Sequence, residues 1–139
     1  MSKNKKRVSC VIQSKLDELH CADTLTEQVA KDLSLNTDQK NNLAIAVTEA
    51  VGNAIIHGNK KNPEKKVSIE IVSDKNQIEI IVRDEGEGFD PNKIQDPLLP
   101  ENLMKESGRG IFILSELMDK VDFKFSEKGT TLKMVMVLK

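Results

Sequence analysis

Three polar side chains recur every four residues in the stretch EAVGNAIIHG, which covers residues 49–58. Glu49, Asn53 and His57 share one stripe of a helix, because each residue turns an α-helix by about 100°. Apolar residues flank the stripe on both sides, and a half-buried carboxylate is costly unless it is paired, bound to a cation or able to hold a proton. The stripe therefore indicates an acid–base or metal-binding surface. Taken alone, it also fits the solvated rim of an ordinary core helix.

A second motif, DEGEGF, begins where an apolar stretch ends and places Asp84 before Gly86 and Gly88. A carboxylate held at a strand end can accept a hydrogen bond from the exocyclic amine of a flat ring. The glycines would let the backbone approach that ring without interference from a Cβ atom. Because Asp-Gly turns are common, a simple loop is the alternative interpretation.

The third motif, SGRGIF, places Gly108 and Gly110 at the start of a predicted helix. Free N–H groups and the positive end of the helix dipole converge there, and that arrangement binds phosphate. The motif lacks the Gly-Lys-Ser/Thr of a P-loop, and no strand leads directly into it as in a dinucleotide fingerprint. A glycine-rich helix start without a ligand is the alternative.

The elements that position these motifs follow from apolar periodicity. Alternation predicts strands at about 7–13, 67–71, 78–82, 121–125 and 132–138, and helices at about 22–33, at about 38–57 and from 108. We expect Thr37 to cap the second helix, and Asp23, Thr24 or Thr26 to cap the first. This order of elements predicts a two-layer α/β (α+β) sandwich, with a mixed, largely antiparallel sheet and helices on one face.

Composition narrows the class of protein. The 139 residues fit one domain, residues 1–139. The chain has 21 Lys and Arg against 22 Asp and Glu and neither Trp nor Tyr, which argues against direct nucleic-acid binding. It has no apolar run that suits a membrane span or a signal peptide. We therefore expect a cytoplasmic protein with no membrane contact and with Cys10 and Cys21 as free thiols.

The order and spacing of the motifs resemble the GHKL ATP-binding superfamily over about residues 8–138. Within it, EAVGNAIIHGN, DEGEGFDP and SGRGIFIL look like the small serine/threonine-protein kinases that act as anti-sigma factors, of the sporulation and stress-response type. The resemblance implies a single histidine-kinase-like ATPase domain with the Bergerat ATP-binding fold, and ATP and Mg²⁺ as cofactors. A histidine kinase would need a further helical domain, and the chain has no room for one.

The resemblance also assigns roles to residues of the helical stripe and the strand end. Asn53 matches the asparagine that binds Mg²⁺, which suits an amide oxygen and a hard cation. Glu49 matches the glutamate proposed as the general base of phosphoryl transfer. Asp84 matches the aspartate that binds the 6-amino group of adenine. For His57, packing, a hydrogen bond on the phosphate side or capping of the helix end are the expected roles.

The remaining assignments concern the glycine motifs and their neighbours. Thr130, in KGTTL, resembles the threonine that supports the adenine site. The resemblance implies that Gly86 and Gly88 give access to the ring and that Gly108 and Gly110 line the phosphates. Lys105 lies just before the SGRGIF motif and Arg109 lies between its two glycines. Relatives often carry a Lys or Arg at this motif that neutralises phosphate charge. Arg109 points either to phosphate or to solvent.

Two classes of function follow from the resemblance. The first is an Mg-ATP-dependent serine kinase that phosphorylates an anti-sigma-factor antagonist of the STAS type, sequesters a sigma factor, or does both, with a homodimer as one possible assembly. The second is a nucleotide-gated protein-binding module without phosphoryl transfer. A phosphate-transfer assay with a candidate antagonist distinguishes them.

Overall fold

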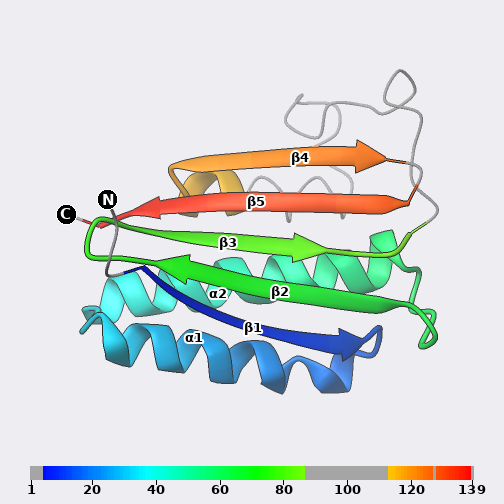
Figure 1. Ribbon diagram of the computed structural model, residues 1–139, viewed down its shortest axis with the longest axis horizontal. Helices are drawn as coiled ribbons and strands as arrows, with labels where there is room; N and C mark the ends of the chain where they lie inside the picture. Colours follow the sequence, from blue (N-terminus) through cyan, green and yellow to red (C-terminus); the bar gives the residue numbers. More distant parts are fainter. Residues whose placement is uncertain (1–4, 87–112, 127, 139) are drawn as a thin grey trace.

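The computed structural model describes residues 5–86, 113–126 and 128–138. The elements in chain order are β1 (Lys6–Gln13), η1 (Leu16–Glu18), α1 (His20–Asp32), α2 (Thr37–Asn53), η2 (Ala54–Gly58), β2 (Lys66–Ser73), β3 (Gln77–Arg83), β4 (Lys120–Ser126) and β5 (Gly129–Val137). Residues 113–117 are also helical. Figure 1 shows one twisted sheet with α1 and α2 lying on the same face of it. The two-layer sandwich expected from the sequence is confirmed.

The sheet has the strand order β1-β2-β3-β5-β4, and every described strand pair is antiparallel. The strands predicted from alternation form two hairpins, β2–β3 and β4–β5. The pairing of β3 with β5 joins these hairpins across a long stretch of chain, with Arg83 opposite Thr131. This pairing brings the end of β3 beside the start of β5, where the candidate site lies.

The core lies between the sheet and the helices. Alternate residues of β2 and β3 point into it: Ile69 pairs with Val82 and Ile71 with Ile80, and each is at most 2% exposed. The helix layer contributes residues at helical spacing on α2, namely Leu43, Ala46, Val47, Ala50 and Val51. Apolar side chains recur every two residues along the strands and about every 3.6 residues along the helices. Each element therefore buries one face, and the packing of these faces forms the two layers.

The helix starts differ from the expected caps. Asn36, not Thr37, caps α2: its side chain accepts from the N–H of Gln39 at 2.8 Å, and the Gln39 side chain accepts from the N–H of Asn36 at 3.1 Å. This reciprocal capping box satisfies two backbone donors at once, and Thr37 could not form one because the residue three positions on, Lys40, has no side-chain acceptor. Among the described residues no side chain caps α1, which follows the η1 turn almost directly. Thr24 and Thr26 instead donate to carbonyls inside the helix.

None of the helices among the described residues has the length and apolar content needed to cross a membrane.

Candidate functional site

The candidate site lies at one end of the sandwich, where the helical run from α2, the end of β3 and the start of β5 meet (Figure 1). The helical run does not end as an ordinary α-helix. After Asn53 it widens into the π-helical turn η2, in which the N–H of Asn59 donates to the carbonyl of Ala54 at 2.8 Å, five residues back. Single π-turns are frequent at functional sites. Here the turn delivers Gly58 to the end of β3.

Asp84 is held by the backbone around it. Its Oδ1 accepts from the N–H of Thr130 at 3.0 Å and from the N–H of Gly86 at 3.0 Å. Its own N–H donates to the carbonyl of Thr130 at 3.0 Å. The carboxylate is thus fixed by one hydrogen bond from β5 and one from its own loop. The structure brings Thr130 to Asp84, and the contact runs through the Thr130 backbone.

Three glycines pack around this aspartate. A Cβ atom on Gly58 would overlap the Asp84 carboxylate on its Oδ2 side, and a Cβ on Gly86 would overlap the carbonyl of Gly58. Gly129 has φ of +140°, and a Cβ there would overlap the Asp84 carbonyl. The end of the helix, the loop after β3 and the start of β5 can therefore approach one another only because all three residues lack side chains. The predicted role of Gly86 beside a ring stays a prediction, but close backbone packing already requires a glycine there.

Burial dominates the electrostatics of Asp84. Loss of water raises the pKa of its carboxyl group above the ordinary value of 3.8, while the N–H groups of Gly86 and Thr130 and the positive charge of Lys65 act in the opposite direction. The net pKa shift is upward. A fixed, partly desolvated carboxylate of this kind suits a neutral donor such as an aromatic amine, because that partner replaces the lost water hydrogen bonds.

Glu49 and Asn53 lie one turn apart on α2, both half-buried, with Asn53 as its last residue. The predicted stripe therefore exists. Among the described residues, the packing that joins this helical run to Asp84 passes through Gly58, five residues beyond Asn53. His57 belongs to η2, and its side chain lies outside the part that the structure describes. The assigned roles of Glu49, Asn53 and His57 stay predictions.

Several residues expected at the site lie outside the described residues. They are Gly88, expected beside the adenine ring, and the phosphate-side residues Lys105, Gly108, Arg109 and Gly110.

Sequence reasoning missed several contributors to the Asp84 site. Gly58, Gly129 and Lys65 were not assigned to this site from the sequence. The available signals were a glycine directly after the polar stripe and a glycine directly before the Thr130 motif. Neither signal has meaning until the β3–β5 pairing and the π-turn bring both glycines against Asp84.

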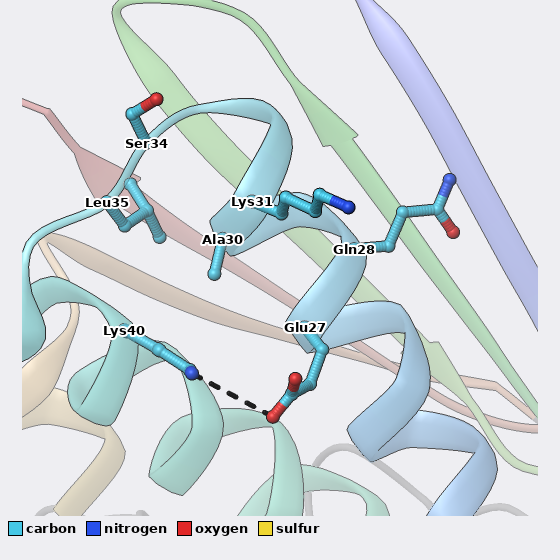
Figure 2. A pocket seen from close by; sticks show the side chains of 7 residues that line it. All are labelled: Glu27, Gln28, Ala30, Lys31, Ser34, Leu35 and Lys40. Atoms are coloured by element: carbon cyan, nitrogen blue, oxygen red, sulfur yellow. Dashed lines mark ion pairs between the residues drawn. The ribbon is translucent and has the colours of Figure 1, made fainter.

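A hollow of about 580 Å³ lies elsewhere, between the end of α1 and the start of α2 (Figure 2). Its lining includes Leu35 and the ion pair between Lys40 and Glu27, whose Nζ and Oε1 atoms are 3.9 Å apart. The hollow is at the opposite end of the 17-residue helix α2 from Gly58. That helix is about 25 Å long at 1.5 Å per residue, so the hollow is separate from the Asp84 site.

A Gly58→Ala substitution tests the close packing at Asp84. The added methyl group cannot be accommodated unless the carboxylate leaves its two backbone donors. We expect the affinity for ATP, measured by titration calorimetry, to fall by roughly tenfold or more, the equivalent of one lost hydrogen bond.

Gly52→Ala is the matched control for Gly58→Ala. Gly52 also lies in the helical run, but a Cβ there would meet no atom of the described residues within 4 Å. Alanine is favoured over glycine inside a helix by about 0.5–1 kcal/mol, so the melting temperature of this variant should rise. An unchanged ATP affinity in Gly58→Ala would show that the Asp84 position does not depend on Gly58.

Comparison with known proteins identifies relatives of this chain over most of its length. The model of the histidine kinase-like ATPase domain family matches residues 12–136. An anti-sigma F factor of Oceanobacillus iheyensis is 40% identical over 102 residues, which cover 70% of this chain and 68% of that protein. The serine-protein kinase RsbW of Bacillus subtilis is 33% identical over 116 residues, which cover 79% of this chain and 72% of RsbW. RsbW of Staphylococcus epidermidis is 38% identical over 104 residues, and the match spans 64% of its length.

Solved structures agree on the fold. The mycobacterial sensor histidine kinase MprB aligns with a TM-score of 0.56 and 16% identity, covering 94% of this chain and 97% of that one. The histidine kinase domain of a blue-light activated kinase from Erythrobacter litoralis aligns with a TM-score of 0.55 and 16% sequence identity. This alignment covers 71% of this chain and 44% of that one. At this identity the likeness concerns the fold alone. Together with the family match and the sequence relatives, it establishes that this chain belongs to the histidine kinase-like ATPase domain family and is related within it to the anti-sigma factor serine kinases.

Proposed function

We propose that this chain is an anti-sigma regulatory kinase, a single ATPase domain that transfers the γ-phosphoryl group of ATP to a serine of an anti-sigma-factor antagonist of the STAS type and sequesters a sigma factor. The observation that carries the proposal is the clamped Asp84 carboxylate, set among three glycines at the end of a helix that bears Glu49 and Asn53. The names of the relatives support the regulatory role and the two partner classes. A cytoplasmic homodimer is the proposed form.

Adenine recognition would use the carboxylate that the backbone has oriented. Oδ1 already accepts two backbone N–H groups, and Oδ2 lies on the side of Gly58. We assign Oδ2 as the acceptor for the 6-amino group of adenine. Guanine carries a carbonyl at that position, and two facing acceptors repel each other, so Mg-GTP should bind much more weakly. A purine would approach Oδ2 on the side of Gly58, where no Cβ atom projects.

Phosphoryl transfer would use the two polar residues of α2. Asn53 offers an amide oxygen to Mg²⁺, and the bound ion would neutralise phosphate charge during transfer. Among the described residues, no group of three or more His, Cys, Asp or Glu side chains could hold a metal ion. Asn53 would share the ion with phosphate oxygens and water, as is usual for Mg²⁺ at nucleotide sites.

Glu49 would accept the proton of the incoming serine hydroxyl as its oxygen bonds to the γ-phosphorus. The bond between that phosphorus and the β–γ bridging oxygen breaks, and ADP leaves with the electron pair. The phosphoserine product gains a charge of roughly −1.5 to −2, which would change how the antagonist docks.

Thermal unfolding with different nucleotides tests nucleotide use. We expect Mg-ATP to raise the melting temperature, because a ligand at one hundred times its Kd stabilises the folded state by about 2.7 kcal/mol. Mg-GTP and ATP with a chelator should give much smaller shifts. Equal shifts of the melting temperature with Mg-ATP and Mg-GTP would contradict the recognition of adenine by Asp84.

Intact mass spectrometry of a candidate STAS antagonist after incubation with Mg-ATP tests the transfer. The antagonist should gain the mass of one phosphoryl group on serine. Nucleotide-dependent binding of the antagonist without this gain would favour the alternative, a nucleotide-gated binding module.

An Asn53→Ala substitution tests the metal ligand. We expect the Kd for Mg-ATP to rise by roughly tenfold more than the Kd for ATP with a chelator, because only the first complex loses an ion contact. Paired calorimetric titrations with and without Mg²⁺ measure this ratio. Equal losses in the two titrations would argue against metal ligation by Asn53.

A further inference from the structure

Asn59 follows directly after the π-turn and is almost fully buried, with 2% of its surface exposed. All the hydrogen-bonding capacity of its amide nitrogen is used. Nδ2 donates to the hydroxyl of Ser14 at 2.7 Å and to the carbonyl of Lys66 at 3.0 Å. Its Oδ1 accepts from the N–H of Glu85 at 2.8 Å. One side chain therefore joins the end of β1, the start of β2 and the loop after β3.

The neighbours of Asn59 are fixed in turn. Ser14, 1% exposed, donates its hydroxyl to the carbonyl of Lys65 at 2.7 Å. The N–H of Lys66 donates to the Glu85 side chain at 2.5 Å. Glu85 is thus held at its backbone by Asn59 and at its side chain by the start of β2. The Lys66–Glu85 bond is exposed, but the part of the network formed by Ser14 and Asn59 is buried and satisfied. That part is rigid, because each of its groups would lose a hydrogen bond if it moved.

Glu85 stands between Asp84 and Gly86, the residue whose N–H orients the Asp84 carboxylate. The direction of that N–H depends on the backbone of residues 84–86. Within this segment, β5 fixes Asp84 and Asn59 fixes Glu85. Without the Asn59 bond, the peptide planes on both sides of Glu85 could rotate and turn the Gly86 donor away.

We propose that Asn59 is a positioning residue for the nucleotide: it fixes the loop that aims the Asp84 carboxylate, and so it sets the discrimination between adenine and guanine nucleotides. The inference deepens the proposed function and rests on it. Asn59 itself stays buried behind the loop and acts through Asp84. Asn59 directly follows η2. The same residue therefore also connects the end of the helical run that carries Glu49 to the loop beside Asp84.

The first test needs no nucleotide. In Asn59→Ala, amide hydrogen exchange at Glu85 and Gly86 should become faster, while the amides of the central β2–β3 pairs keep their protection relative to global stability. Thr26→Ala is the matched control, since Thr26 is also buried, at 3% exposed, and loses one hydrogen bond inside α1. Faster exchange across the whole sheet, without a local excess at Glu85 and Gly86, would overturn the proposal.

The second test measures selectivity. The ratio of the Kd values for Mg-GTP and Mg-ATP should fall by roughly tenfold in Asn59→Ala, the effect of about one lost hydrogen bond, and should stay unchanged in Thr26→Ala. Ser14→Ala keeps the bond to Glu85, so it should lower the melting temperature and leave the ratio close to wild type.

The two ideas fail in different ways. If wild-type protein does not prefer Mg-ATP, the proposed function fails. If it does, and Asn59→Ala keeps the same preference, Asn59 has only a structural role.

Discussion

Replacing Glu49 by glutamine should lower the rate of phosphoryl transfer by a factor of roughly 10²–10⁴, the usual contribution of a positioned general base, with ATP binding retained. The substitution keeps the shape and the hydrogen-bonding reach of the side chain but removes its ability to take a proton. Glu49 is half-buried on α2, one turn before Asn53, and Asn53 is unchanged in the variant. The loss should therefore appear in the rate and not in the Kd for Mg-ATP.

The measurement is single-turnover phosphorylation of the antagonist, followed by intact mass, alongside calorimetry with Mg-ATP. Glu27→Gln is the matched control, because Glu27 lies on α1 in an exposed ion pair with Lys40, beside the separate hollow. Its rate should equal wild type. Retained transfer in Glu49→Gln would refute the assigned base.

Asp84→Asn should weaken ATP binding by roughly 100-fold, the upper range for a hydrogen bond that involves a charged group. Asparagine can still accept the N–H groups of Thr130 and Gly86 through its oxygen. Its amide nitrogen would then occupy the Oδ2 side, and this donor would face the donating 6-amino group of adenine. Binding therefore suffers while the local backbone keeps its partners. Calorimetry with Mg-ATP gives the loss, and equal affinity in the variant would exclude Asp84 as the adenine acceptor.

The same substitution should make the nucleotide-free protein more stable than wild type at neutral pH. Burial raises the pKa of Asp84 above 3.8, so the folded state holds the proton more tightly than the unfolded chain does. The stability linked to this proton is full below pH 3.8 and is lost as the pH rises through the raised pKa. Asparagine stays neutral throughout. The difference in unfolding free energy between variant and wild type, measured by urea unfolding, should therefore grow from acidic to neutral pH.

A pH-independent difference between the two proteins would show that ionisation of Asp84 costs the fold nothing. An excess stability of Asp84→Asn, together with lost binding, would instead identify a carboxylate that is kept for function at the expense of stability.

Periodicity was sufficient for the layers of the fold and for the elements that carry the chemistry. Alternating apolar residues such as Ile69 and Ile71 can bury one side only if the segment is a strand, and the spacing of Leu43, Val47 and Ala50 can do so only as a helix. Asp84 was also singled out from the sequence, because an acid before Gly-x-Gly is a local pattern, and Thr130 because KGTTL resembles a motif of the family. The cap of α2 was misplaced by one residue, since Asn and Thr both suit that position and only the reciprocal bond with Gln39 decides between them.

By itself, then, the sequence determined the strands, the helices and the chemical types of the site residues, because these depend on interactions a few residues apart. Only the tertiary structure decided that β5 pairs with β3, that a π-turn presses Gly58 against Asp84, and that Asn59 holds the adjoining loop. The physical reason is distance along the chain. Asp84 and Thr130 are 46 residues apart, and Asn59 and Glu85 are 26 apart. Such contacts form only when the whole core closes, so no local pattern of residues encodes them.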